Sequence, residues 1–341
     1  MSPASTEQFL LEQYTGHPAS QLQDLRKALY QSVFGCGHLI TDTSAAAEGI
    51  RREAAEAGPC SREIEALDGP WSRVHLGVLA DGLTPETLAC IFARSAAMPH
   101  GDADTLQEKL AVLRRLIHSG ALPYSPAEAD AELDDWRKNG FPACHHSDEY
   151  RAAYRPAYRV LHRTYVRLLP LLAAIDRALA ENPRVLLAIE GGAASGKSTL
   201  ADLLTAIYPD TALFHADDFF LRPEQRTAAR YAQPGGNLDR ERLESEILAP
   251  ISRNEAAVYR PFDCRTLSLR EPVTVLPGRL NIVEGSYSFH PELTRYYDLS
   301  VFLDISPEIQ RSRILARNGP EWGQQFFDRW VPLEQTYFHE T

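Results

Sequence analysis

The sequence has little that would suit a secreted or membrane-bound protein. Its five cysteines are scattered, odd in number and without a Cys-x-x-Cys pair, which favours free thiols in a reducing compartment over disulfides. No apolar run approaches the about 20 residues that cross a membrane. The first residues, MSPASTEQFLLEQYTG, lack the basic and apolar regions of a signal peptide. The sequence therefore predicts a soluble, cytoplasmic protein.

Positive charge is scarce relative to negative charge. The 341 residues include 46 Asp and Glu against 35 Lys and Arg, so the net charge is −11. Because nucleic acids and anionic lipid surfaces attract basic proteins, this balance argues against a nucleic-acid or membrane partner. We expect a small-molecule partner instead, and the sequence leaves open whether the chain forms a homo-oligomer.

Two regions of different pattern divide the chain. Up to about residue 182, leucines and aromatics recur at the three- and four-residue spacings typical of amphipathic helices. Beyond it, apolar runs such as RVLLAIE and RLNIVEG alternate with helical segments, as in a parallel sheet covered by helices on both faces. We predict an α/β protein with a mainly helical N-terminal domain over 1–146, a connecting helix over 147–183 and an α/β domain over 184–341.

The stretch EGGAASGKSTLADLL contains the P-loop pattern Gly-x-x-x-x-Gly-Lys-Ser, after a strand-like run and at the start of a helix. Glycines allow successive backbone N–H groups to face phosphate oxygens, and the helix N-terminus adds a positive partial charge. The lysine can reach the β- and γ-phosphates, and the serine hydroxyl is a magnesium ligand. We therefore predict a nucleoside triphosphate site formed by Gly191, Gly192, Ala193, Ala194, Ser195, Gly196, Lys197, Ser198 and Thr199.

Two other strand-like runs end in carboxylates. TALFHADDFF ends in Asp217 and Asp218, and RLNIVEG contains Glu284 just after its apolar residues. Ligands of open α/β sheets bind at the carboxyl ends of the strands, where a carboxylate can accept a proton from a hydroxyl or hold a metal. A helix cap for the aspartates and a solvated turn for the glutamate are the alternative interpretations.

At this point the C-terminal half resembles a known family. The segments GGAASGKST, DDFF, NLDRERLESEIL, YRPFD, IVEGSY and VFLDISPEIQRSRILARN are similar to those of the uridine kinases, phosphoribulokinases and pantothenate kinases, and to the uridine kinase group in particular. The resemblance covers about residues 185–338 and none of the N-terminal half. It implies a P-loop kinase fold, ATP and Mg²⁺ as cofactors, and phosphoryl transfer to a hydroxyl of a small molecule.

The family pattern also implies individual roles. Asp217 matches the aspartate that acts as general base and metal ligand, and Glu284 matches the glutamate that completes the magnesium shell with Ser198. The remaining implied residues are Asp239 on the hydroxyls of the acceptor, Phe262 beside its base, and Lys197, Arg313 and Arg317 on the transferring phosphoryl group.

Departures from the pattern weaken the assignment to uridine itself. The stretch FDCRTLSL offers Arg265 where uridine kinases carry a histidine that reads the pyrimidine, so Arg265 joins the acceptor-side candidates. The lid segment is short, and the chain stops before a last strand usual in such kinases, which leaves open that a C-terminal piece is missing. A nucleoside is the first acceptor we expect. The alternatives are an acidic or sugar-phosphate acceptor, or a nucleotide-dependent switch with a protein-binding helical domain.

An arginine recurs every fourth residue before the P-loop domain. The positions are Arg151, Arg155, Arg159, Arg163 and Arg167. On one helix, bent near Pro156, they would form a stripe that is either a solvated, salt-bridged face or an anion-binding surface at the kinase cleft. Because only ENPR separates this segment from the next strand, we also expect the two domains to pack together and the N-terminal domain to close one side of the acceptor pocket.

Overall fold

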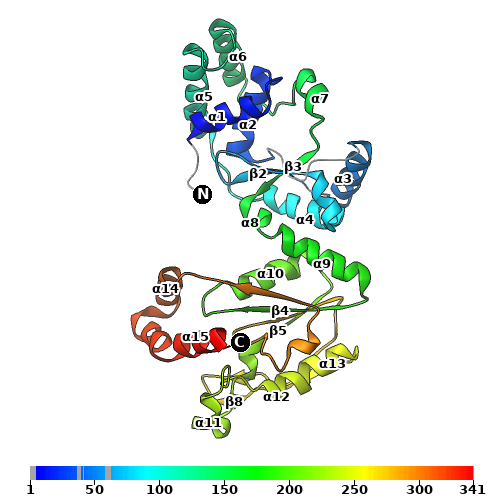
Figure 1. The fold of residues 1–341 in the computed structure, drawn as a ribbon, viewed down its shortest axis with the longest axis vertical. Coiled ribbons are helices and arrows are strands. Elements are labelled where there is room, and N and C mark those ends of the chain that lie inside the picture. The colour runs from blue at the N-terminus through cyan, green and yellow to red at the C-terminus, as the bar shows by residue number, and fades with distance from the viewer. Residues whose placement is uncertain (1–4, 37–39, 41, 58–62, 341) are drawn as a thin grey trace. The chain divides into compact units, whose positions relative to one another are not determined.

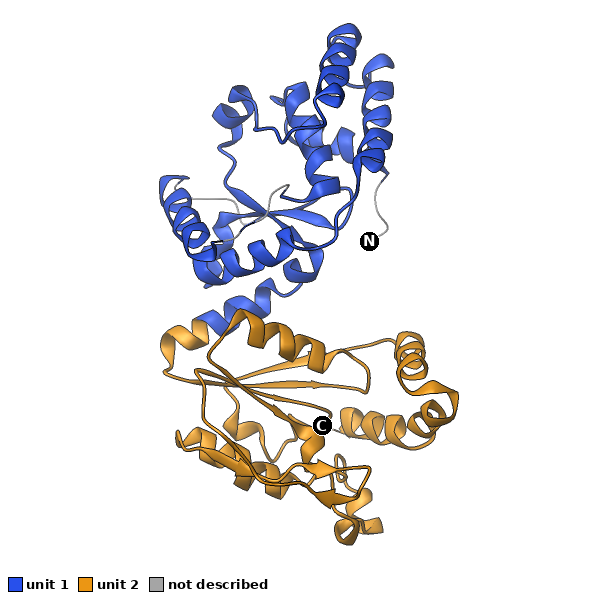
Figure 2. Cartoon of the chain, turned by 180° about the vertical axis from the view of Figure 1, so that it is seen from behind, with its two compact units in different colours: residues 1–176 blue, residues 177–341 orange. Residues whose placement is uncertain are grey.

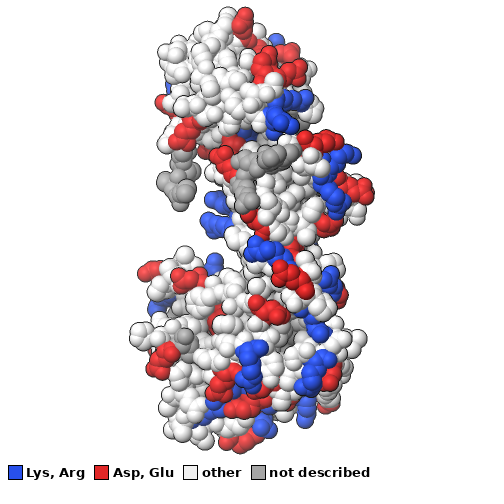
Figure 3. All heavy atoms as spheres, turned by 45° about the vertical axis from the view of Figure 1, so that its right-hand side comes forward, with Lys and Arg blue, Asp and Glu red and all other residues white. Residues whose placement is uncertain are grey.

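The computed structural model describes residues 5–36, 40, 42–57 and 63–340. The chain divides into two compact units, residues 1–176 and residues 177–341 (Figure 2). The division lies within helix α9, Leu169–Glu181. Acidic and basic side chains are interspersed over the face that Figure 3 shows.

The first unit is mainly helical, as predicted. Several of its helices begin at capping residues: Thr84 accepts a hydrogen bond from the backbone N–H of Thr87, and Asp102 accepts one from that of Thr105. Leucines on the inner faces of these helices form one buried cluster that includes Leu25. The helices are α1 (Thr6–Gly16), α2 (Leu22–Phe34), α3 (Thr43–Ala57), α4 (Pro85–Ala96), α5 (Ala103–His118), α6 (Pro126–Lys138), α7 (Asp148–Tyr154) and α8 (Arg163–Val166), followed by α9.

A three-stranded antiparallel sheet in this unit was not predicted from the sequence. It consists of β1 (Ile64–Ala66), β2 (Trp71–His75) and β3 (Tyr158–His162), in the order β1-β2-β3. Strand β3 pairs with β2 although the two are far apart in the chain. Such pairing depends on tertiary contacts that no local spacing reveals.

The prediction of one connecting helix over 147–183 is wrong. Helix α7 ends at Tyr154, Arg155 adopts a left-handed conformation with φ of 44°, and Pro156 follows. Proline disfavours the helical conformation in the residue before it and lacks a backbone N–H, so the helix stops there. The chain continues as strand β3 and returns to helix only in α8 and α9. The five regularly spaced arginines therefore lie on different elements and form no single stripe.

The second unit is built on a parallel four-stranded sheet in the order β11-β4-β10-β5. All residues of β4 and β10 are buried, and most of them are apolar, as expected for strands covered on both faces. Figure 1 shows α10 on one face of this sheet and the segment α12–α13 on the other. Phe214 and Val283 of the sheet pack with Ile247 and Leu248 of that second segment in one buried cluster. The predicted α/β class, with a parallel sheet covered by helices, is confirmed.

The elements of the second unit have the following bounds. The strands are β4 (Val185–Gly191), β5 (Thr211–His215), β6 (Ala257–Tyr259), β7 (Phe262–Asp263), β8 (Ser268–Leu269), β9 (Val273–Val275), β10 (Leu280–Glu284) and β11 (Leu299–Leu303). The helices are α10 (Lys197–Ile207), α11 (Ala228–Tyr231), α12 (Arg240–Leu243), α13 (Ala249–Ser252), α14 (Pro307–Gln325) and α15 (Val331–Glu340). Helix α14 is kinked at Gly319, where φ is 76°.

Two findings bear on the expected compartment. Among the described helices, none combines the length and the apolar character needed to span a bilayer. Cys36, Cys90, Cys144 and Cys264 are free thiols, and Cys60 lies outside the described residues.

Candidate active site

The P-loop, Asp217 and Glu284 lie at the carboxyl ends of the parallel strands of the second unit. Strand β4 ends at Gly191 and leads into the P-loop, β10 ends at Glu284, and β5 ends at His215 just before Asp217. In the sheet register, Glu284 lies beside Ile189 of β4 and His215 of β5. Residues that are distant in the chain thus come together at one edge, where open α/β sheets bind ligands.

The P-loop leaves the N-terminus of α10 without a side-chain cap. Gly196 occupies the cap position with a left-handed φ of 106°, and the first turn of the helix carries no acidic residue. Gly191 also has a positive φ, 151°, and a Cβ there would lie 2.6 Å from the carbonyl oxygen of Leu303. The two glycines are therefore required by the backbone. The result is a helix N-terminus whose first amides have no side-chain cap, which suits an anion.

Two polar side chains of the loop could bind a phosphate. The partners of one are loop carbonyls that a phosphate could replace, and the other has no partner among the described residues. Lys197 Nζ donates to the carbonyl oxygens of Gly191 and Gly192, each at 2.9 Å. The buried Ser195 hydroxyl has no hydrogen-bond partner among the described residues. A buried polar group without a partner carries a free-energy penalty, so the loop gains from an oxygen-rich ligand.

Ser198 and Glu284 form a pair beside the loop. The Ser198 hydroxyl donates to Glu284 Oε1 at 3.2 Å, and His215 Nδ1 lies 2.6 Å from the same oxygen. This hydrogen bond raises the pKa of His215, with nearby carboxylates acting in the same direction and burial opposing them. His215 was not predicted as a site residue. Its place directly before the Ala-Asp-Asp stretch at a strand end was the only available signal.

Asp217 and Asp218 follow β5 in a short 3-10 turn, Ala216–Phe219. Desolvation by the surrounding protein atoms raises the pKa of Asp217, although the side chain is exposed at the surface. The positive charge of Lys197 opposes this shift, and the negative charge of Glu284 adds to it. Desolvation also raises the pKa of Asp218. Arg317 is close enough to act electrostatically on Asp217. The structure thus brings the predicted base, lysine and metal-side glutamate into one electrostatic cluster.

Glu190, at the end of β4, is a buried anchor for the segment that follows β10. Its carboxylate accepts hydrogen bonds from the backbone N–H groups of Gly191, Tyr287 and Phe289 at 2.9–3.0 Å and from the Tyr337 hydroxyl at 3.2 Å. Burial raises the pKa of Glu190 to about 7, and the backbone donors oppose this shift. The residue ties the P-loop strand to the neighbouring turn and was not predicted.

Helices α14 and α15 hold the loop directly. Glu334 of α15 accepts hydrogen bonds from the backbone N–H of Ala193 at 2.8 Å and from the Ser286 hydroxyl at 2.7 Å. Gln310 of α14 donates to the carbonyl oxygen of Ala193 at 3.0 Å. Burial raises the pKa of Glu334, while its hydrogen bonds and Lys197 oppose the shift. No feature of the sequence distinguished Glu334 from other helical glutamates.

The two predicted lid arginines, Arg313 and Arg317, both lie on α14. Arg313 donates to the carbonyl oxygen of Ala194 at 3.1 Å, so it already touches the P-loop. Arg317 donates to the Asn318 side chain at 2.8 Å and lies over the Phe326 ring.

The acceptor-side candidates occupy different environments. Asp239 is buried, caps α12 and accepts a hydrogen bond from Gln225 at 2.8 Å. Phe262 is buried on β7, with the Arg226 guanidinium 5.6 Å from its ring centre. Arg265 is exposed, and its backbone N–H donates to Asp263 in a turn. Of these three, Asp239 has carboxylate oxygens already committed to the fold, and its role toward an acceptor stays a prediction.

Comparisons with known proteins show a partial likeness. No family model and no curated protein matches the chain. A solved structure described as a candidate uridine kinase from Bacillus stearothermophilus is 21% identical, with a TM-score of 0.37, over 50% of this chain and 92% of its own. One described as a candidate fructose transport system kinase from Silicibacter sp. TM1040 is 21% identical, with a TM-score of 0.40, over 49% of this chain and 91% of its own. Both matches cover about half of this chain.

Proposed function

We propose that the chain is an ATP- and Mg²⁺-dependent kinase that phosphorylates a hydroxyl of a small molecule, with a nucleoside as the first acceptor class. The observation that carries this proposal is the convergence of Asp217 and the Ser198–Glu284 pair beside a P-loop whose helix has no side-chain cap. A phosphate-binding loop alone would equally serve an ATPase, and the adjacent carboxylate favours transfer to a hydroxyl.

The loop supplies the contacts to the triphosphate. The amides at the start of α10 face the anion, and Lys197 exchanges its two bonds to loop carbonyls for charge-assisted bonds to phosphate oxygens. The hydroxyl of Ser195, which lacks a partner among the described residues, gains one from the same ligand. Because these groups lie on one strand–loop–helix element, they are in place before the nucleotide arrives.

The oxygen donors beside the loop fit a magnesium ion. In the described part of the chain, no cluster of three His, Cys, Asp or Glu side chains could hold a metal unaided. Magnesium is usually held by one or two carboxylates while waters and substrate phosphates complete its shell. Ser198, Glu284 and Asp217 offer that donor set. When bound, the ion would neutralise charge on the β- and γ-phosphate oxygens.

Asp217 is the proton acceptor in this proposal. Its raised pKa makes the carboxylate a stronger base than a solvated aspartate, and the Lys197 charge opposes that shift. The hydroxyl proton passes to Asp217 Oδ as the acceptor oxygen attacks the γ-phosphorus, and the bond from that phosphorus to the β,γ-bridging oxygen breaks, which releases ADP. The guanidinium groups of Arg313 and Arg317 lie on the adjacent helix, where they can stabilise charge on the phosphoryl oxygens.

The test compares two neighbouring carboxylates. Purified chain is incubated with ATP, Mg²⁺ and a panel of nucleosides, sugars and hydroxy acids, and products are identified by mass spectrometry. Asp217→Asn should lower kcat by about 100-fold or more while the ATP dissociation constant changes less than about threefold. Asp218→Asn is the matched control and should retain most of the activity. ATP binding by the wild type without any phosphorylated product across the panel would contradict the proposal.

A nucleotide-dependent switch is a second candidate, because Gln310, Arg313 and Glu334 connect the loop directly to α14 and α15. Nucleotide binding at the loop could move those helices and expose a protein-binding surface. A switch needs no base for an acceptor, so Asp217→Asn would leave ATP turnover unchanged. For a switch, ATP should instead change the rate of backbone hydrogen exchange in α14 and α15.

A further inference from the structure

The first unit contains a cavity of about 590 Å³ whose lining is predominantly basic. All of its lining residues belong to the first unit, residues 1–176. Its charged lining residues are Lys27, Arg151, Arg155, Arg159, Glu53 and Glu56. The volume falls in the range of pockets that bind small molecules. Three of the five regularly spaced arginines thus meet at one cavity, although they lie on different elements.

Two of these arginines have no counter-charge of their own. Arg159 is committed to an ion pair, with its Nη2 2.7 Å from Glu53 Oε2. By contrast, the side chains of Arg151 and Arg155 make no hydrogen bond or ion pair with any described residue. In the part of the chain that the structure describes, these two guanidinium groups are therefore available to an anion at the cavity.

The positive charges at this cavity affect the pKa of a neighbouring lysine. Burial lowers the pKa of Lys27, and the charges of Arg73 and Arg151 lower it further. Burial likewise lowers the pKa of His146 to about 4, although its hydrogen bond to the Asp24 carboxylate opposes this shift, so this lining residue is neutral at physiological pH. Lys27 Nζ donates to the carbonyl oxygen of Cys144 at 2.8 Å, which fixes the ammonium group at the cavity wall.

The floor of the cavity is held by a hydrogen-bond network. His146 Nε2 lies 2.6 Å from the Tyr158 hydroxyl, and His146 Nδ1 lies 2.8 Å from the buried Asp24 carboxylate. Gln31, which also lines the cavity, accepts a hydrogen bond from the buried Arg73 at 2.8 Å. Side chains tied in this way lose little freedom when a ligand binds, which favours affinity.

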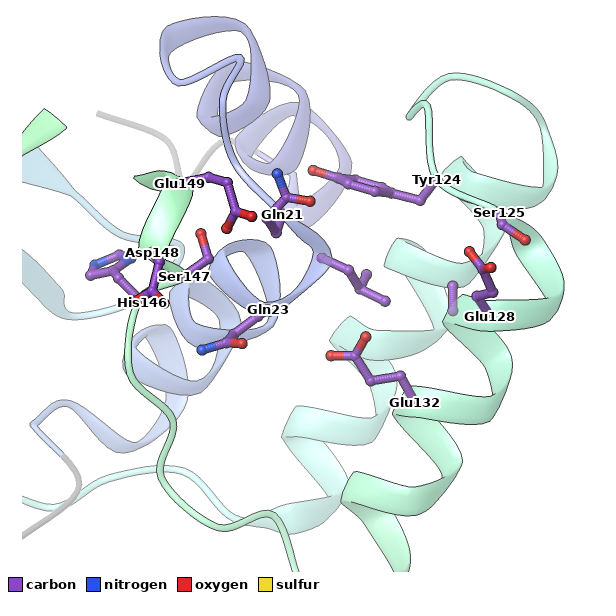
Figure 4. Close-up of a pocket in the computed structure, with 12 residues that line it drawn as sticks. Gln21, Gln23, Tyr124, Ser125, Glu128, Glu132, His146, Ser147, Asp148 and Glu149 are labelled. Atoms are coloured by element: carbon purple, nitrogen blue, oxygen red, sulfur yellow. The ribbon is translucent and has the colours of Figure 1, made fainter. Parts of the chain in front are cut away.

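A neighbouring cavity of about 460 Å³ provides a contrast, because it shares His146 but has the opposite charge. Figure 4 shows that its carboxylates come from two sides, Glu128 and Glu132 from α6 and Asp148 and Glu149 from the start of α7. An anion entering this unit would therefore be repelled from one cavity and attracted to the other.

We propose that the basic cavity binds a small organic anion through a phosphate or carboxylate group held by Arg151, Arg155 and Lys27. Guanidinium groups form paired, charge-assisted hydrogen bonds with either kind of anion, and the ammonium group adds a third donor. This site is independent of the kinase proposal, because none of its residues belongs to the P-loop unit.

The experiment is calorimetric titration of the full chain with three probes, namely inorganic phosphate, ribose 5-phosphate and succinate. The double variant Arg151→Gln/Arg155→Gln should weaken binding of the preferred probe by about tenfold or more. Arg163→Gln/Arg167→Gln is the matched control, because these arginines belong to the same sequence spacing but do not line the cavity. Lys197→Met separates this site from anion binding at the P-loop.

The proposal predicts that binding is retained in Lys197→Met and in the Arg163/Arg167 control. If ribose 5-phosphate or inorganic phosphate binds more tightly than succinate, the ligand carries a phosphate group. If succinate binds more tightly, the ligand carries a carboxylate group. The proposal is overturned if the wild type binds none of the probes, if Lys197→Met abolishes binding, or if both arginine pairs weaken it equally.

Discussion

The P-loop and the basic cavity of the first unit show how differently two anion-binding surfaces can be encoded. The P-loop takes its donors from one continuous stretch, residues 191–199, whose glycine spacing and helix start are visible in the local sequence, although α14 and α15 also hold the loop. The cavity draws its basic groups from α2, α7 and β3, which meet only through tertiary packing. A site formed by one continuous stretch can therefore be predicted from the sequence, whereas a site assembled from distant segments by packing cannot.

The largest expected effect lies in the local site. Lys197→Met removes the ammonium group that lies over the loop carbonyls, so we expect turnover to fall by about 100-fold or more and ATP to bind more weakly. Steady-state kinetics and ATP titration measure both quantities. Lys138→Met, an exposed lysine at the end of α6, serves as the control. Equal activity of the two variants would mean that the P-loop is not the nucleotide site.

A second prediction concerns the buried support of the P-loop. The pKa of Glu190 is raised to about 7 in the folded chain, so its contribution to stability is full below its unfolded value of about 4.5 and is lost as the pH rises through about 7. Urea unfolding should therefore show that the penalty of Glu190→Gln is largest near pH 5. That penalty should shrink by up to about 3 kcal/mol by pH 8. A penalty that grows with pH would show that the carboxylate is the stabilised form.

A smaller effect is expected where helix α15 meets the loop. Glu334 places a negative charge next to Lys197 and the phosphate-binding amides. Removing this charge in Glu334→Gln should tighten ATP binding about threefold, because a like charge near the triphosphate is lost. Glu340→Gln, at the exposed end of the same helix, should leave the affinity unchanged. Weaker ATP binding by Glu334→Gln would instead mean that the loop needs the hydrogen bonds of this carboxylate to keep its conformation.

The smallest expected effect concerns the end of helix α7 at Arg155, beside the basic cavity. Arg155 has a left-handed φ of 44°, which glycine adopts without strain, so Arg155→Gly should raise the free energy of unfolding by about 0.5 kcal/mol. Arg151→Gly, inside α7, should lower it by about 1 kcal/mol. Urea unfolding of both variants measures the difference. If both glycines destabilise the chain equally, residue 155 is helical in solution, and the arginines lie closer to the stripe first expected.

The parts of the structure that could be predicted from sequence follow the same division. The parallel sheet was predicted from apolar runs because strands buried on both faces are mostly apolar, and the P-loop was predicted from its glycine spacing. Strand β3 was missed because the four-residue arginine spacing suggested a helix, although Pro156 excludes one there. Glu190, His215 and Glu334 were missed because their partners are set by tertiary contacts.

The central claim is that the P-loop unit transfers the γ-phosphate to a hydroxyl acceptor. The most direct measurement follows the label from γ-³²P-ATP after incubation with the preferred acceptor of the panel. We predict that the label appears on the acceptor in the wild type and that Asp217→Asn loses this transfer while it still binds ATP. Release of all label as inorganic phosphate, at the same rate with and without each acceptor, would contradict the claim.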